Sequence, residues 1–145
     1  MRRLALVLLL AAVVPGAASA DQGDWAKASA APARVSAARS LTLQLHYEMT
    51  CGQPSGAVTV RFPVRMQLLK TFGVRIGRLA VPNVLVNGRT VTFSIPRRGV
   101  TCMSIGPATA TFVFTGVRNP SRPGSYMLHA AAENHDFATP VIVRN

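Results

Sequence analysis

Few residues in this chain could carry out catalysis, and their spacing matches no catalytic motif. Between residues 40 and 145 the only carboxylates are Glu48, Glu133 and Asp136. Paired-carboxylate chemistry would have to join Glu48 to one of the other two, yet all three are explained equally well as solvated polar positions. The chain has no Gly-x-Ser-x-Gly elbow, His-Glu-x-x-His, Cys-x-x-Cys or glycine-rich phosphate loop. We therefore expect a protein that is not an enzyme and that uses no cofactor.

The three histidines, His46, His129 and His135, raise a second possibility, which is metal binding. If His46 and His129 fell on adjacent strands, they could bind copper or zinc with Met49 or Met127 nearby. Against this, the sequence lacks the close Cys, His and Met cluster of a blue-copper site, and isolated exposed histidines usually bind nothing. An extracytoplasmic copper- or zinc-handling protein is therefore the alternative function.

The N-terminus has the three parts of a secretory signal peptide. Arg2 and Arg3 are positive, residues 4–14 are uninterruptedly apolar, and Ala18-Ser19-Ala20 is a small-x-small cleavage site. The apolar run is much shorter than the roughly 20 residues that span a bilayer. We expect cleavage after Ala20 and a mature protein that is secreted and either extracellular or associated with the cell wall, without a transmembrane anchor.

Two cysteines, Cys51 and Cys102, lie in the predicted mature chain. Because exported proteins reach compartments where disulfides persist, we expect them to pair. Closing this loop would restrict the unfolded chain by roughly 4 kcal/mol on the chain-entropy model. A free reactive pair or a metal site is the alternative, although no further Cys or His lies at ligand spacing beside either residue.

Basic residues outnumber acidic ones, with 16 Lys or Arg against 5 Asp or Glu, which gives a formal net charge of +11. No acidic residue occurs between Met49 and Ala132. Such a chain should adhere to anionic cell-wall polymers or lipid headgroups, with no specific nucleic-acid partner. The candidate contacts are Arg61, Arg65, Arg97 and Arg98. Coding bias in a GC-rich genome could equally supply the arginines, which number 14 against 2 lysines.

The hydrophobic pattern predicts one β-domain over residues 40–145, preceded by an Ala/Ser-rich spacer over residues 21–39. Residues 41–49 alternate between apolar and polar, and so do 58–66, 108–115 and 126–132, which is the period of a half-buried strand. Residues 66–81 show no clear pattern. Six to eight short strands without βαβ spacing predict a small immunoglobulin-like antiparallel β-sandwich.

Two turns have recognisable sequences. Asn87-Gly88 between apolar runs predicts a type I′ hairpin turn, which would place Val84 opposite Val91. Gly124-Ser125-Tyr126 enters a late strand and resembles the tyrosine corner of immunoglobulin-like folds. Tyr126 would then bond back to the connection that precedes it.

Four motifs together resemble uncharacterised secreted immunoglobulin-like domains of high-GC Gram-positive bacteria. They are Cys51-Gly52-Gln53-Pro54, Val86-Asn87-Gly88, Thr101-Cys102 with Ile105-Gly106-Pro107, and Asn119-Pro120 to Tyr126. The resemblance covers about residues 40–143 and implies fold and export. It implies no activity, so we expect an exported, non-enzymatic binding or structural module.

Overall fold

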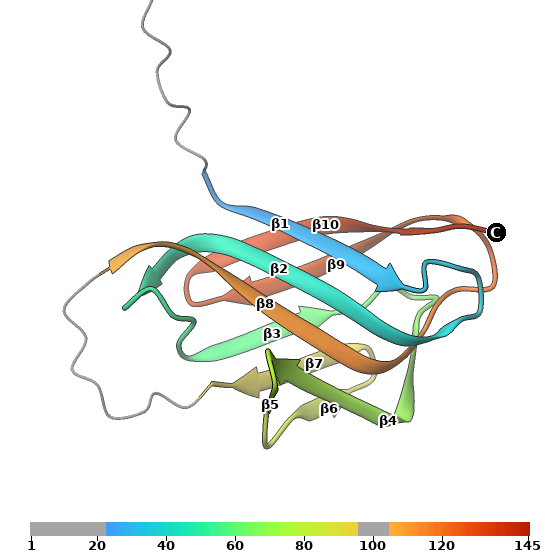
Figure 1. Cartoon of the computed structure of the whole chain (residues 1–145), viewed down its shortest axis with the longest axis horizontal. Coiled ribbons are helices and arrows are strands. Elements are labelled where there is room, and N and C mark those ends of the chain that lie inside the picture. Colours follow the sequence, from blue (N-terminus) through green and yellow to red (C-terminus); the bar gives the residue numbers. More distant parts are fainter. Residues whose placement is uncertain (1–22, 96–104) are drawn as a thin grey trace, which may run out of the picture.

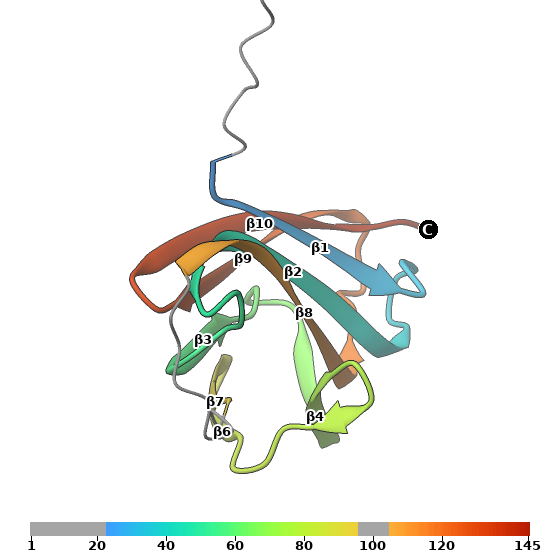
Figure 2. The same ribbon diagram turned by 60° about the vertical axis from the view of Figure 1, so that its left-hand side comes forward.

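The computed structural model describes residues 23–95 and 105–145 and arranges them in two antiparallel sheets packed face to face (Figure 1, Figure 2). The first sheet has the order β1-β2-β8-β4-β5. Its strands are β1 (Trp25–Ala31), β2 (Ala38–Thr50), β8 (Ile105–Arg118), β4 (Gln67–Ile76) and β5 (Leu79–Ala80). The second sheet has the order β10-β9-β3-β7-β6. Its strands are β10 (His135–Val143), β9 (Gly124–Ala132), β3 (Ala57–Arg61), β7 (Thr90–Ser94) and β6 (Leu85–Asn87).

This architecture confirms the predicted antiparallel β-sandwich. The described residues contain ten strands rather than six to eight. The strands that the sequence did not predict are β1, β4 and β5, and β5 has only two residues, too few to show a pattern. The described residues form no helix that is long and apolar enough to cross a membrane.

The core is built from the inward positions of the alternating segments. In β2 every second side chain is buried, from Leu41 to Met49. A cluster of aromatic rings fills the middle of the sandwich, with Phe62 perpendicular to Phe114 at a centroid distance of 5.3 Å. Phe93 meets Phe112 at the same distance. Such edge-to-face pairs stabilise the core beyond the burial of their area.

Residues 25–31 correct the prediction of a spacer over residues 21–39, because they form β1. Ala26, Ala28 and Ala30 face inward, and β1 pairs with β2 from Trp25 opposite His46 to Ala31 opposite Ser40. Both views show β1 beside β10, where it closes one edge of the sandwich (Figure 1, Figure 2). The sequence hides this strand because alanine and serine have weak β-propensity and give little hydrophobic contrast.

The strand predicted over residues 58–66 ends earlier than expected, at Arg61. Pro63 has no N–H for a ladder, and its carbonyl accepts a bond from the Met66 N–H, which makes a turn. Val64, placed on the inward face by the alternation, is 75% exposed on this turn. The chain then enters β4, where the sequence showed no clear pattern because the pairing with β8 is shifted between Leu68 and Gly73.

The predicted hairpin is present, but its turn is displaced by one residue. Asn87 pairs with Thr90, so the two turn residues are Gly88 and Arg89. Gly88 has a φ of 59°, whereas Asn87 has no positive φ, and a type I′ turn at Asn87-Gly88 is therefore wrong. Val86, not Val84, lies opposite Val91. The pairing has moved by two positions along the partner strand, so the inward and outward faces remain as predicted.

Candidate anion-binding site at the arginine end

The antiparallel strands bring the arginines of distant turns to one end of the sandwich, which we call the arginine end. It is the right-hand end in Figure 1, where β2 and β4 begin and β3 and β8 end. The arginines there are Arg34, Arg39, Arg61, Arg65, Arg89, Arg118, Arg122 and Arg144.

The described side-chain carboxylates lie at the opposite end, which we call the carboxylate end. They are Asp24, Glu48, Glu133 and Asp136. Asp24 precedes β1, Glu48 lies near the end of β2, and the other two flank the turn between β9 and β10. The charges are therefore separated along the strands, although no such separation is visible when the sequence is taken in order.

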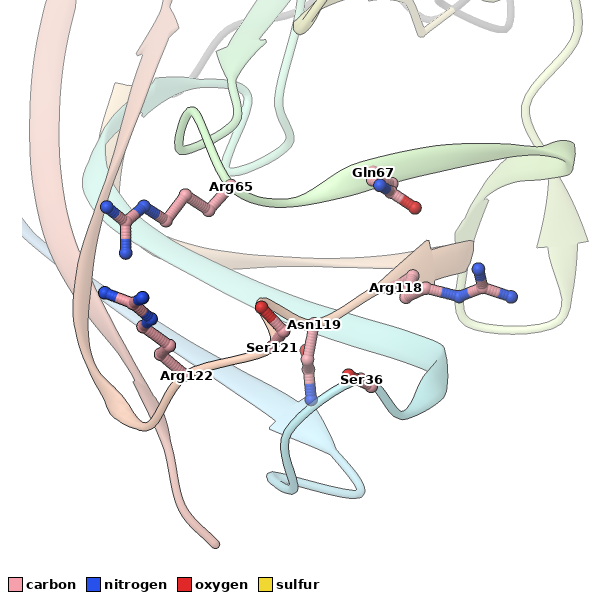
Figure 3. A pocket seen from close by; sticks show the side chains of 7 residues that line it. All are labelled: Ser36, Arg65, Gln67, Arg118, Asn119, Ser121 and Arg122. Carbon is pink, nitrogen blue, oxygen red and sulfur yellow. The ribbon is translucent and has the colours of Figure 1, made fainter.

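A hollow of about 610 Å³ opens at the arginine end, and we call it the first hollow. Figure 3 shows the side chains that line it, which come from β4, the end of β8 and the turns beside them. They are Ser36, Arg65, Gln67, Arg118, Asn119, Ser121 and Arg122. Its lining therefore holds three cationic side chains, four neutral polar ones and no carboxylate.

The loop after β8 is fixed by hydrogen bonds that leave its arginines unused. Asn119 is buried, and its Nδ2 donates to the carbonyl oxygens of Pro32 at 2.9 Å and Arg34 at 2.8 Å. The Tyr126 hydroxyl donates to the Arg122 carbonyl oxygen at 2.7 Å. This is the bond that a tyrosine corner makes, and it holds the backbone of Arg122 in place.

A second hollow of about 380 Å³ adjoins the first, since Arg65 lines both. Its cationic lining residues are Arg61, Arg65 and Arg89, and His129 and Tyr126 also border it. The turn that carries Arg89 is held to the end of β3 from both sides. Its backbone carbonyl accepts from the Phe62 N–H at 2.9 Å, and its Nη1 donates to the Phe62 carbonyl oxygen at 3.0 Å.

Of the four arginines predicted as anion contacts, Arg61 and Arg65 lie at this end and line the hollows. Arg97 and Arg98 lie outside the described residues. Arg89, Arg118 and Arg122 also line the hollows, although they were not among the predicted contacts. They could have been found by noting that every second connection of an antiparallel sandwich lies at the same end, so that arginines at alternate turns converge.

His46 and His129 lie in different sheets, so the condition for a metal site that they share on adjacent strands is not met. The His46 ring stacks on Trp25 at a centroid distance of 5.2 Å, and its Nδ1 is 2.9 Å from the Thr109 Oγ1. The His135 Nδ1 is 2.5 Å from an Asp24 carboxylate oxygen. Within residues 23–95 and 105–145, no three His, Cys, Asp or Glu side chains gather as a metal site would require.

Cys51 lies in the connection after β2, at the carboxylate end. Cys102 is outside the described residues, so the pairing of the two cysteines stays a prediction.

Two of the four carboxylates at the carboxylate end, Glu133 and Asp24, bond to other residues of the protein. A Glu133 carboxylate oxygen accepts from the Ser55 N–H at 3.0 Å and from the Ser55 hydroxyl at 2.6 Å. Nearby, the Tyr47 hydroxyl is buried without a hydrogen-bond partner among the described residues. Burial, reinforced by the negative charge of Glu133, raises the pKa of Tyr47 to about 12.

No protein-family model matches the sequence, and no curated protein matches it. Among solved structures, the chain is similar to the bacterial hydrophobin BslA, with a TM-score of 0.53 and 13% identity over 84% of this chain and 97% of that one. It is also similar to the N-terminal domain of a Streptococcus gordonii adhesin, with a TM-score of 0.48 and 14% identity over 86% of this chain and 33% of that one. A collagen adhesin from S. aureus matches with a TM-score of 0.45 and 9% identity over 88% of this chain and 51% of that one. The similarity to BslA supports the β-sandwich fold.

Proposed function

We propose that the chain is an exported, non-enzymatic binding module that contacts anionic polymers of the cell envelope through its arginine end. The observation that carries this proposal is the convergence of arginines on two adjoining hollows whose lining contains no carboxylate. A cationic concavity of this kind attracts polyanions more strongly than the same charges scattered over the surface.

The pairing of these charges also supports the proposal. Among the described residues, the guanidinium groups of Arg65, Arg118 and Arg122 have no hydrogen-bond or ion-pair partner. Coding bias would explain the number of arginines, but it would not by itself collect them at one end of the fold. At the carboxylate end, by contrast, Glu133 bonds to Ser55 and Asp24 to His135.

The test is the retention of the secreted protein on isolated cell envelopes over a range of salt concentrations. We expect retention at about 0.05 M salt and release by about 0.5 M, because screening shortens the reach of exposed charges. The variant Arg65→Glu with Arg122→Glu should lose most of this retention. The matched control is Arg75→Glu with Arg78→Glu, which changes the net charge equally beside the β4–β5 turn.

The control should remain bound to a higher salt concentration than the variant of the arginine end. Equal release of the two variants would show that only net charge matters and would contradict a localised site. A wild-type protein that stays unbound at low salt would contradict the proposed function itself.

Exposed apolar side chains favour a second candidate function, adsorption to an apolar surface. Leu79 in β5 is 57% exposed, and Leu85 and Val86 in β6 are 70% and 49% exposed. Both strands are at sheet edges, and residues 81–84 join them. Exposed apolar side chains on an edge strand are a liability unless something covers them.

Surface tension at an air–water interface tests this candidate. Wild-type protein should lower the tension more than a Leu79→Ser, Leu85→Ser variant. A Val64→Ser control, whose side chain is exposed on the turn between β3 and β4, should behave as wild type. If the double variant is as surface-active as wild type, adsorption through this edge is excluded.

A further inference from the structure

We propose that Arg65 and Arg122 form a discrete site for a phosphate group, in which one tetrahedral anion bridges the two guanidinium groups. This inference rests on the proposed function, because it names the chemical group that the arginine end would hold. It concerns one part of the first hollow and not the whole cationic surface.

The arrangement of the two side chains is the first argument. In Figure 3 the side chains of Arg65 and Arg122 extend to the same side of the hollow, where their guanidinium groups approach one another in this view, whereas the Arg118 side chain extends to the opposite side. Two positive charges on the same side of one hollow repel, and an anion bound by both would offset that repulsion. No carboxylate lines the hollow, and within the described residues neither guanidinium has a partner.

Each arginine is also carried by a turn whose backbone is already fixed. Arg65 lies in the turn closed by the Met66 N–H and the Pro63 carbonyl. Arg122 lies between two prolines, and its own carbonyl accepts the Tyr126 hydroxyl. Binding therefore costs little backbone conformational entropy, and only the exposed side chains lose conformational freedom.

The chemistry of the guanidinium group selects phosphate over carboxylate. A guanidinium presents a planar fork of donors that matches two oxygens of one anion. A carboxylate has two oxygens in one plane and a single charge, which suits one arginine. A phosphate monoester or inorganic phosphate carries between one and two negative charges and several acceptor oxygens, so it can satisfy two forks at once. Ser121 also lines the hollow and adds a hydroxyl that can donate, whereas the amide donors of Asn119 are already used by the Pro32 and Arg34 carbonyls.

The test is a titration of the secreted protein, followed by NMR, with inorganic phosphate, dimethyl phosphate and acetate at constant ionic strength. We expect inorganic phosphate to bind at least about 10-fold more tightly than acetate. Arg65→Ala and Arg122→Ala should each weaken phosphate binding by about 10-fold or more. Arg75→Ala should change it less than about 2-fold, because its Nη2 donates to the Arg78 carbonyl away from the hollow.

The Arg65→Lys variant tests whether phosphate binding needs the planar donors of the guanidinium group or only its positive charge. Because lysine keeps the charge and loses the planar donors, we expect an affinity between those of wild type and Arg65→Ala.

The affinity for dimethyl phosphate identifies the kind of molecule that supplies the phosphate group. Affinity equal to that for inorganic phosphate assigns the site to the internal diesters of a polymer, and weaker affinity assigns it to phosphate monoesters.

Two results would overturn the site: phosphate binding no tighter than acetate binding, or phosphate binding that persists when both Arg65 and Arg122 are replaced by alanine. Neither depends on envelopes, so failure of the site and failure of the proposed function are distinguishable. Retention on envelopes with no preference for phosphate removes the site alone. Phosphate binding without retention removes the envelope partner alone.

Discussion

The two ends of the sandwich use charge in opposite ways. At the carboxylate end, charged groups take part in the fold, since Glu133 accepts two bonds from Ser55 and Asp24 meets His135. At the arginine end, Asn119 and Tyr126 hold the loop after β8, Arg89 is the charged side chain that also holds a turn, and most of the other charged side chains face solvent. Net charge alone is therefore a poor guide to where a protein binds its ligand. What matters is whether a charge is already satisfied by its neighbours.

Asn119→Ala should give the largest loss of stability, because Asn119 connects the loop after β8 to the segment between β1 and β2. Its removal takes the side-chain donor from the carbonyl oxygens of Pro32 and Arg34 in a part-buried position, where, among the described residues, only the Arg34 oxygen keeps a second bond, from the Ala37 N–H. We expect the free energy of unfolding to fall by about 2–4 kcal/mol, measured by urea denaturation.

The matched control is Asn134→Ala in the exposed turn of the carboxylate end, which should change stability by less than about 0.5 kcal/mol. Losses of similar size in the two variants would contradict the structural role of Asn119.

The two tyrosines make a smaller and sharper comparison between the ends. Tyr126→Phe removes the bond to the Arg122 carbonyl and should cost about 1 kcal/mol. Tyr47→Phe removes a buried hydroxyl that has no described partner, so it should be neutral or stabilise by up to about 1 kcal/mol. Denaturation under the same conditions measures both. If Tyr47→Phe is the more damaging substitution, our account of the carboxylate end is wrong.

Alkaline titration should show the smallest effect, and only at the carboxylate end. The Tyr47 pKa of about 12 exceeds the ordinary value of 10.0, so the folded protein keeps a proton that the unfolded chain loses. This contribution to stability is complete below pH 10 and declines as the pH rises toward 12.

Phenolate absorbance in a Tyr126→Phe variant reports Tyr47 alone, since the chain has two tyrosines. A midpoint near 10 would show that Tyr47 is not held in its neutral form by burial.

The parts of the fold that the sequence predicts are those with strong hydrophobic contrast. Leu41, Leu43 and Leu45 alternate with polar residues, and the structure buries all three. The failures have local physical causes. Strand β1 is rich in alanine, so its inward and outward positions differ little in hydrophobicity. The turn at Gly88-Arg89 depends on a pairing register that an Asn-Gly pair alone does not determine.

The candidate site was predictable only in part, for a different reason. Arg61 and Arg65 are close in sequence, but Arg118 and Arg122 reach the first hollow through the pairing of β4 with β8. The direction in which Arg122 points depends on the loop fixed by Asn119 and Tyr126. Convergence of this kind depends on topology, so residue types along the chain could not reveal it.

The position of β1 determines how the molecule can be displayed. The chain enters the sandwich at the carboxylate end and leaves it at Asn145, beside the arginine end (Figure 1). Any attachment through the N-terminus therefore holds the arginines at the distal tip, facing outward. A purification tag or fusion partner placed after Asn145 would instead stand beside the hollows and crowd them. Immobilisation through the N-terminus is accordingly the geometry in which ligands should be screened.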